Sequence, residues 1–151
     1  MANSFSANFK AHAFVRDLAP RHIRILLECA TPRDFAKGEY LKRQGDAAGE
    51  FYLIRSGRVA LEISLPHDGA LRIDTLGKGD VVGWSWLVHP YRWRFDARAT
   101  TAVTAFGIST GCLRNECEQD HPFGYAILSR CAPVIAERLQ ATQIKLLELG
   151  T

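Results

Sequence analysis

The sequence predicts a mainly β domain with flanking helices, in which a roll of short strands is followed by a long C-terminal helix. Three observations lead to this fold class. Over about residues 35–108, short apolar segments alternate with turn glycines, as is typical of a β-sandwich or barrel. Apolar residues at helical spacing precede this region, over 18–30, and follow it up to residue 149. A length of 151 residues fits one domain.

Composition and charge exclude few function classes. Hydrophobic residues at 47% and charged residues at 23% are ordinary for a soluble globular protein. The formal net charge of +3 permits anion or nucleic-acid binding without requiring it. No apolar run is long enough for a transmembrane helix, and the N-terminus lacks the pattern of a secretory signal. We therefore expect a cytoplasmic protein without membrane contact, with residues 1–10 as a flexible leader.

The helix expected over residues 18–30 begins with Pro20, which suits a first helical turn. In the β region, the alternation is clearest in residues 59–65, where every second side chain is a large aliphatic one. Gly57 and Gly69 are expected to supply positive φ angles at turns, and residues 67–69 are expected to form the tip of a hairpin.

Two helices are expected after Gly111. Residues 112–118 form a short one, and Asp120 is a suitable N-cap for the long one that follows. Pro133 is expected to bend the long helix. These hinge and dimerisation helices cover about residues 110–149.

The long helix has a repeat in which small or apolar residues recur at alternating steps of four and three. This heptad seam consists of Leu128, Ala132, Ile135, Leu139, Thr142, Leu146 and Leu149. Such spacing is the signature of a two-stranded coiled coil and predicts a homodimer through this helix. The alternative is a single amphipathic helix packed on its own roll.

The four cysteines, Cys29, Cys112, Cys117 and Cys131, form neither a CxxC pair nor a zinc-binding arrangement with histidine. Without an export signal they are expected to be reduced thiols that act as small buried hydrophobic residues. Cys112 and Cys117 could approach each other on one short helix. The five histidines have no metal-ligand spacing, so no metal site is predicted.

These elements, in this order, resemble the cyclic nucleotide-binding domain of the catabolite activator protein and fumarate–nitrate regulator family. The resemblance covers roughly residues 14–149 and is carried by LKRQGDAAGEFYLIRSGRVALEI (41–63), LGKGDVVG (76–83), ARATTAVTAF (97–106) and AERLQAT (136–142). It implies a double-stranded β-helix, or jelly roll, within a single domain over residues 11–151. It also implies a regulatory role and not an enzymatic one.

The phosphate-binding cassette departs from the family's pattern. In the family, a glycine-glutamate-leucine segment is followed by arginine, serine or threonine, and alanine. The glutamate binds the ribose 2′-hydroxyl, and the arginine neutralises the cyclic phosphate. Here Trp84 stands in the place of the glutamate and Trp93 in the place of the arginine. A shift of one residue would restore an arginine from Arg92 or Arg94, and Asp96 could substitute for the glutamate.

The resemblance makes eight residues candidates for ligand binding: Val82, Gly83, Trp84, Ser85, Trp86, Trp93, Arg94 and Thr142. Thr142 matches the family's threonine that contacts the purine across the dimer, although a threonine is also tolerated in a coiled-coil core. Three interpretations stay open. The ligand could have changed to another nucleotide-like anion on which the tryptophans stack. The domain could bind cyclic AMP or cyclic GMP as the family does. Alternatively, the indoles fill the pocket and the domain binds nothing.

The expected function is that of a stand-alone regulatory ligand-sensing domain. It would be a homodimer that passes a ligand-induced change to a separate effector protein. The alternative is a ligand-free dimeric interaction scaffold. The family's regulators carry a helix-turn-helix after this domain, and the sequence contains none, so direct DNA binding is not expected. No nucleophile–base pair or carboxylate dyad stands out, so an enzyme is not expected.

Overall fold

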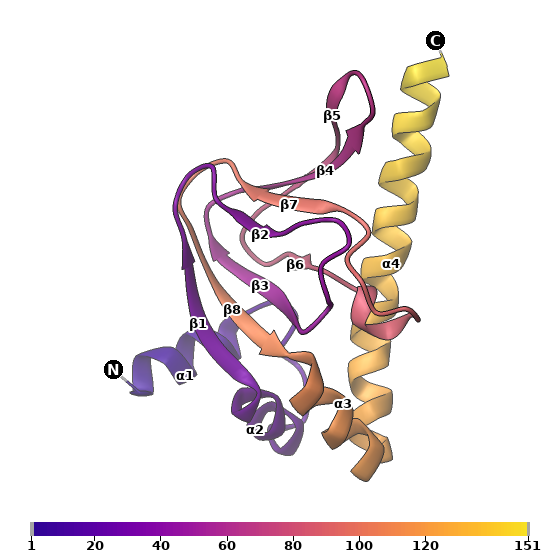
Figure 1. Ribbon diagram of the computed structural model, residues 1–151. Helices are drawn as coiled ribbons and strands as arrows, with labels where there is room; N and C mark the ends of the chain where they lie inside the picture. Colours follow the sequence, from indigo (N-terminus) through magenta and orange to yellow (C-terminus); the bar gives the residue numbers. More distant parts are fainter. Residues whose placement is uncertain (1, 151) are drawn as a thin grey trace.

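The computed structural model describes residues 2–150 (Figure 1). Two helices, α1 (Ala2–Ala11) and α2 (Pro20–Glu28), precede the strands, and two, α3 (Thr110–Gln119) and α4 (His121–Gly150), follow them. The strands are β1 (Ala30–Phe35), β2 (Tyr40–Lys42), β3 (Glu50–Ser56), β4 (Val59–Leu65), β5 (Gly69–Leu76), β6 (Val81–Val82), β7 (Asp96–Ala99) and β8 (Val103–Ser109). A short 3₁₀ turn, η1 (Ser85–Leu87), lies between β6 and β7.

The strands form two four-stranded sheets, with the orders β1-β8-β3-β6 and β2-β7-β4-β5. All of the strand pairs are antiparallel, and the buried side chains of both sheets belong to one hydrophobic core. This arrangement confirms the predicted jelly roll with flanking helices. The roll begins at Ala30, slightly earlier than the expected residue 35, because β1 pairs with β8 over its whole length.

The predicted turns follow the local glycine signals. Gly69, with a φ of +74°, opens β5 after the hairpin turn, and Leu65 pairs with it across the hairpin. Gly57 has a φ of +91°, and a Cβ atom there would lie 2.1 Å from the carbonyl oxygen of Ala102. Only glycine therefore fits at position 57, both for its backbone angle and for the close approach.

Helix α1 occupies residues 2–11, where we expected a flexible leader up to residue 10. Phe5 and Phe9 lie four residues apart and so share one face of this helix. Phe9 is fully buried, and its ring lies edge-on to that of Phe106 with 5.1 Å between centroids. Burial of the Phe9 ring against Phe106 of β8 stabilises the packing of α1 on the roll.

The expectation of four reduced thiols was wrong, because Cys29 and Cys112 form a disulfide bond across a sequence separation of 83 residues. Cys29 caps the end of α2, and Cys112 lies in the first turn of α3. The pairing of Ala30 with Ile108 draws these two helix ends together. Cys112 therefore bonds to Cys29 and not to Cys117, which remains a free thiol together with Cys131.

Helix α4 starts where the sequence predicts. The backbone N–H of Phe123 donates to the carboxylate of Asp120 over 3.1 Å, so Asp120 acts as the cap. The helix then runs without a break through Pro133 to Gly150 and lies along the side of the roll (Figure 1). The side chains that pack on the roll are Phe123, Ile127, Cys131, Val134 and Arg138.

The heptad seam of α4 is a different face of the helix. Leu128, Leu139, Leu146 and Leu149 are between 53% and 64% exposed. At 100° per residue, this seam lies about a quarter of a turn from the buried face. The seam leucines are therefore not required for packing α4 on its own roll.

Candidate ligand pocket beside the long helix

The cassette residues follow β6 and lead through η1 into β7. Val82 is fully buried and pairs with Tyr52 of β3, which holds the start of the cassette in the first sheet. Gly83 then turns the backbone with a φ of +106°. This left-handed conformation favours glycine and directs the chain out of the sheet into η1.

Trp93 fills the space beside this turn. It is only 4% exposed, and a Cβ atom at Gly83 would lie 2.7 Å from Cη2 of its indole. The ring also lies next to that of Tyr52, with 6.2 Å between centroids, and burial raises the pKa of this tyrosine. The chain therefore places an apolar ring against the glycine that follows β6.

The other two tryptophans occupy different environments. Trp86 is 5% exposed, and its ring is stacked on Phe51 with 5.7 Å between centroids and 5° between planes. Trp84 is half-buried, and the guanidinium of Arg94 lies 5.6 Å from the centre of its ring. Trp86 thus belongs to the core, whereas Trp84 and the exposed Arg94 form a cation–π pair at the edge of the cassette.

The cavity left at the cassette has a volume of about 10 Å³. Its walls come from the cassette, β4 and α4: Leu61, Gly83, Trp84, Ser85, Trp93, Phe95 and Arg138. This volume is close to the minimum that holds one water molecule. Pockets for small molecules usually measure roughly 300–1,000 Å³, so a nucleotide does not fit without displacement of Trp93 or a neighbour.

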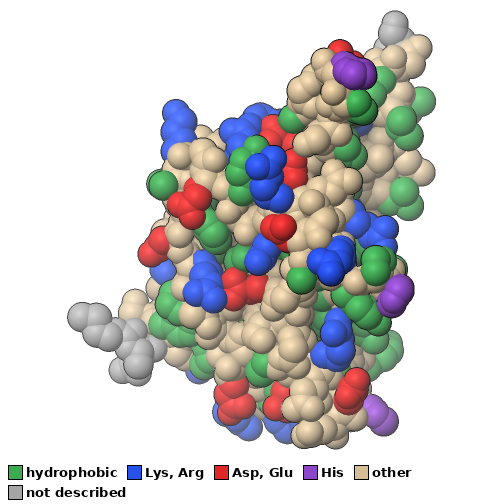
Figure 2. Space-filling view, viewed as in Figure 1, with side chains coloured by type: hydrophobic (Ala, Val, Ile, Leu, Met, Phe, Trp, Pro, Cys, Tyr) green, Lys and Arg blue, Asp and Glu red, His purple; other side chains and the backbone are tan. Residues whose placement is uncertain are grey.

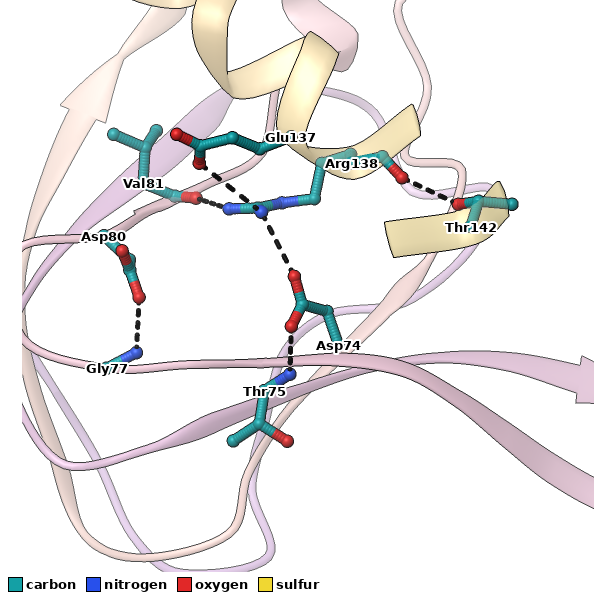
Figure 3. Close-up of polar contacts among 8 residues, drawn as sticks. All are labelled: Asp74, Thr75, Gly77, Asp80, Val81, Glu137, Arg138 and Thr142. Carbon is teal, nitrogen blue, oxygen red and sulfur yellow. Dashed lines mark hydrogen bonds and ion pairs between the residues drawn. The ribbon is translucent and has the colours of Figure 1, made fainter. Parts of the chain in front are cut away.

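Arg138 is the one charged residue that reaches the cavity wall, and it comes from α4. Its side chain is 5% exposed. One terminal nitrogen donates to the carbonyl oxygen of Val81 over 3.0 Å, and the other lies 3.4 Å from the carboxylate of Asp74 in β5 (Figure 3). The Nε atom of Arg138 is buried without a hydrogen-bond partner among the described residues. This arginine connects the long helix to both sheets of the roll.

Sequence analysis did not single out Arg138, although it lies inside the AERLQAT segment that carried the resemblance. From the sequence alone, an arginine between apolar heptad positions is expected to be exposed to solvent. Only the path of α4 across the roll shows that the side chain of Arg138 faces the roll. The hydroxyl of Thr142 donates to the carbonyl oxygen of Arg138 over 2.8 Å (Figure 3).

The expected substitutes for the missing charges are not in the pocket. The carboxylate of Asp96 accepts from the backbone N–H of Gln44 over 2.7 Å and from the hydroxyl of Ser64 over 3.1 Å. Arg92 donates to the carbonyl oxygen of Gly45 over 3.2 Å. Arg98, a further arginine of β7, donates to both carboxylate oxygens of Glu62 over 2.9 and 3.0 Å. This hydrogen-bonded carboxylate raises the pKa of the guanidinium.

The structure therefore brings together four of the eight candidate residues, since Gly83, Trp84, Ser85 and Trp93 line one small cavity. Val82 and Trp86 belong to the hydrophobic core behind it. Arg94 lies outside on Trp84, and the Thr142 hydroxyl bonds within its own helix. Within residues 2–150, no cluster of three or more His, Cys, Asp or Glu side chains is placed to hold a metal ion.

A comparison with sequence families identifies the domain. The family defined as the cyclic nucleotide-binding domain matches residues 32–120, which is more than half of the chain. The chain belongs to the cyclic nucleotide-binding domain family. Among curated proteins, none matches the sequence closely enough to count as a relative.

Solved structures of this family share the fold at low sequence identity. A cyclic nucleotide-binding domain from Methylobacillus flagellatus KT has a TM-score of 0.82 at 16% identity, over 97% of this chain and 85% of that one. The sensor domain of the transcriptional regulator DNR from Pseudomonas aeruginosa has a TM-score of 0.72 at 19% identity, over 91% and 93%.

A third structure is the c-di-GMP responsive global regulator CLP from Xanthomonas campestris, with a TM-score of 0.75 at 23% identity. The matched region is 87% of this chain but only 65% of that regulator. At these identities the likeness establishes the cyclic nucleotide-binding fold alone. None of the helices in the described part of the chain is long and apolar enough to cross a membrane.

Proposed function

We propose that this cyclic nucleotide-binding domain is a non-enzymatic regulatory module whose nucleotide pocket is closed by its own side chains, and that it acts as a dimeric interaction scaffold. The observation that carries the proposal is the cavity of about 10 Å³ between Trp93, Gly83 and Arg138. Of the three interpretations left open by the sequence, this small cavity favours the filled pocket.

Charge supports the same conclusion. A buried cyclic phosphate needs a guanidinium or several amide donors, because an unpaired buried charge costs several kcal/mol. The cassette offers Trp93 where the family has its arginine. The one buried guanidinium nearby, that of Arg138, is already bonded to Val81 and paired with Asp74. A cyclic nucleotide would therefore have to break an existing ion pair as well as displace an indole.

The exposed seam of α4 supports a dimer. Hydrophobic side chains are exposed along the C-terminal half of this helix (Figure 2). The heptad pattern also extends three residues before Leu128 to Tyr125, which is 76% exposed. Pairing of two such seams would bury a row of leucines that one chain leaves in water. A separate effector protein would then recognise the dimer.

Ligand binding is tested by thermal unfolding with cyclic AMP, cyclic GMP, cyclic di-GMP and AMP. A ligand at about 100 times its dissociation constant stabilises by about 2.7 kcal/mol. We expect no shift in melting temperature for the unaltered protein with any of the four. The double variant Trp84→Glu/Trp93→Arg restores the two family side chains and should gain a shift with a cyclic nucleotide. A shift in the unaltered protein would overturn the closed pocket.

The dimer is tested by light scattering coupled to size-exclusion chromatography. Leu139→Glu/Leu146→Glu places charges in the seam and should convert a dimer into a monomer. Ile144→Glu is the matched control, because Ile144 is 50% exposed but lies nearly opposite the seam on the helix. A monomeric unaltered protein, or equal effects of the seam and control variants, would contradict the proposal.

A second candidate function, ligand sensing, is supported by one observation. The Nε atom of Arg138 is buried without a partner among residues 2–150, and such orphaned donors often mark a site where a ligand completes the bonding. An anionic ligand that displaced Trp93 would meet this guanidinium. The thermal panel distinguishes the two functions, since only the sensing function gives a ligand-dependent shift in the unaltered protein.

A further inference from the structure

A second groove, remote from the cassette, is lined by positive charge. It lies between α1, the turn that follows α1, the end of β3 and the loop between β5 and β6, and has a volume of about 430 Å³. Its charged lining residues are Arg16, Arg55 and Lys78, and no aspartate or glutamate is among the residues that line it. The volume is within the usual range for small-molecule sites.

The three cations have no carboxylate partner among the described residues. Elsewhere in the chain, five basic side chains (Arg21, Arg33, Arg98, Arg138 and Lys145) form ion pairs. Arg55 is half-buried, and its guanidinium lies 5.4 Å from the centre of the Phe106 ring. Arg16 and Lys78 are exposed. No ion pair within residues 2–150 therefore engages these three side chains.

One carbonyl oxygen accepts hydrogen bonds from two of the segments that line the groove. The oxygen of Ile54 accepts from the Nε2 of His12 and from the backbone N–H of Gly79, each over 3.0 Å. His12 carries the turn that leads to Arg16, and Gly79 directly follows Lys78. Ile54 itself precedes Arg55. This carbonyl thus ties together the three chain segments that supply the three cations.

His12 forms the floor of the groove without adding charge to it. It is 7% exposed, and its Nδ1 accepts from the backbone N–H of Phe14 over 3.1 Å. Both ring nitrogens are thus occupied in the neutral tautomer, and burial lowers the pKa of the imidazole. The carboxylate of Asp80 accepts from the backbone N–H of Gly77 over 2.9 Å (Figure 3), and Asp80 lines a neighbouring cavity and not this groove.

We propose that this groove binds a small multivalent anion of the phosphate class. Two guanidinium groups can each donate a pair of hydrogen bonds to phosphate oxygens, and the ammonium group of Lys78 adds a further charge. Clustered like charges repel each other, so an anion that bridges them relieves that repulsion. The site contains no cassette residue, so it does not depend on whether the nucleotide pocket is closed.

The test is isothermal titration of the full chain with inorganic tripolyphosphate at low ionic strength. Lys78→Gln and Arg16→Gln should each weaken binding at least fivefold. Lys37→Gln is the matched control, because Lys37 is an exposed lysine in the turn between β1 and β2 and does not line the groove. Its affinity should equal that of the unaltered protein. The backbone amide signal of Gly79 should shift in NMR spectra during the titration.

Two outcomes would overturn the proposal. The first is no measurable binding of tripolyphosphate by the unaltered protein. The second is equal weakening by Lys37→Gln and by the two groove variants, because that result would indicate a general attraction of the anion to a basic protein. Vesicles of phosphatidylcholine with and without a phosphatidylinositol phosphate distinguish the source of the anion. Binding of tripolyphosphate with the expected variant pattern supports a soluble ligand. The same pattern with the phosphoinositide vesicles supports a headgroup as the source.

Discussion

The indole of Trp93 lies where any side chain at position 83 would have to go. A Cβ atom at Gly83 would be 2.7 Å from Cη2 and 2.9 Å from Cζ2 of this ring. Gly83 also has a φ of +106°. Glycine is therefore required at position 83 for two reasons: its backbone angle and the space that the Trp93 ring occupies.

Gly83→Ala should lower the free energy of unfolding by about 2–3 kcal/mol. The cost combines a residue forced into a left-handed conformation with overpacking against a buried indole. Urea unfolding followed by tryptophan fluorescence measures it. Gly49→Ala is the control, because a Cβ atom there meets nothing within 4 Å. A loss equal to that of the control would show that the cassette yields easily around Trp93.

Asp74→Asn should destabilise the protein by about 1–2 kcal/mol, because it leaves the buried guanidinium of Arg138 with less compensation. Asp74 is itself 33% exposed, which limits the size of the effect. If the two residues interact as the structure shows, the double variant Asp74→Asn/Arg138→Met should cost less than the sum of the single changes by about 0.5 kcal/mol or more. Strict additivity in this cycle would rule out the interaction.

The control for this cycle is a surface pair on the same helix. Lys145 lies 3.1 Å from Glu148, three residues further along α4. Exposed pairs at this spacing contribute only about 0.3–0.5 kcal/mol. Lys145→Met should therefore change the free energy of unfolding by less than about 0.5 kcal/mol.

Reduction of the Cys29–Cys112 disulfide should lower the free energy of unfolding by about 2–4 kcal/mol, because the bond closes a loop of 83 residues and limits the unfolded chain. Urea unfolding with and without a phosphine reductant measures the difference. A Cys29→Ser/Cys112→Ser variant should match the reduced protein and no longer respond to the reductant. Identical unfolding curves for the oxidised and reduced protein would contradict this prediction.

Alkylation gives an independent count of thiols. In denaturant without reductant, two cysteines should react, and with reductant all four should react. In the native protein at pH 7.5 we expect slow reaction, since burial raises the pKa of Cys131 to about 12 and also raises the pKa of the half-buried Cys117. Rapid modification of four thiols without reductant would show that the bond is not formed.

Acid should weaken the fold through His12. Burial lowers the pKa of this imidazole, and the bond to Ile54 and the nearby Asp80 oppose the effect only in part. The unfolded chain then binds a proton that the folded chain does not. The contribution of His12 is complete above about pH 6.5 and is lost as the pH falls below that value. The loss is therefore larger at pH 5.5 than at pH 7.5.

The measurement compares urea unfolding at pH 7.5 and pH 5.5 for the unaltered protein and for His12→Gln. Glutamine can still donate to the Ile54 carbonyl but does not titrate. The variant should therefore have a smaller difference between the two pH values. An unchanged difference would assign the pH dependence to other groups.

Much of the fold was predictable because its signals are local. Gly57 and Gly69 mark turns through their backbone angles, and Asp120 marks a helix start through its capping bond. The alternation over residues 59–65 predicts β4, and the structure has a strand there. The choice between an indole that stacks on a ligand and one that fills the pocket depends on volume, which no sequence pattern contains.

The remaining features depend on contacts between distant segments. Cys29 meets Cys112 because β1 pairs with β8, whereas the cysteine nearest to Cys112 in sequence, Cys117, is not its partner. Helix α1 is stabilised by Phe9 against Phe106, a contact between two segments far apart in the sequence. The inward position of Arg138 follows from the angle at which α4 crosses the roll. Each of these features is a product of packing that local propensity does not encode.

All eight strands of the roll lie between Cys29 and Cys112. The sulfur bridge therefore closes the whole β structure into a covalent ring, and the terminal helices leave from the point where the ring is closed. Mechanical tension applied to the two ends of the chain would pass across the bridge from α2 to α3 and leave the strands unloaded. A protease cut in the hairpin loop between β4 and β5 would likewise release no fragment, because both halves of the ring stay joined through sulfur.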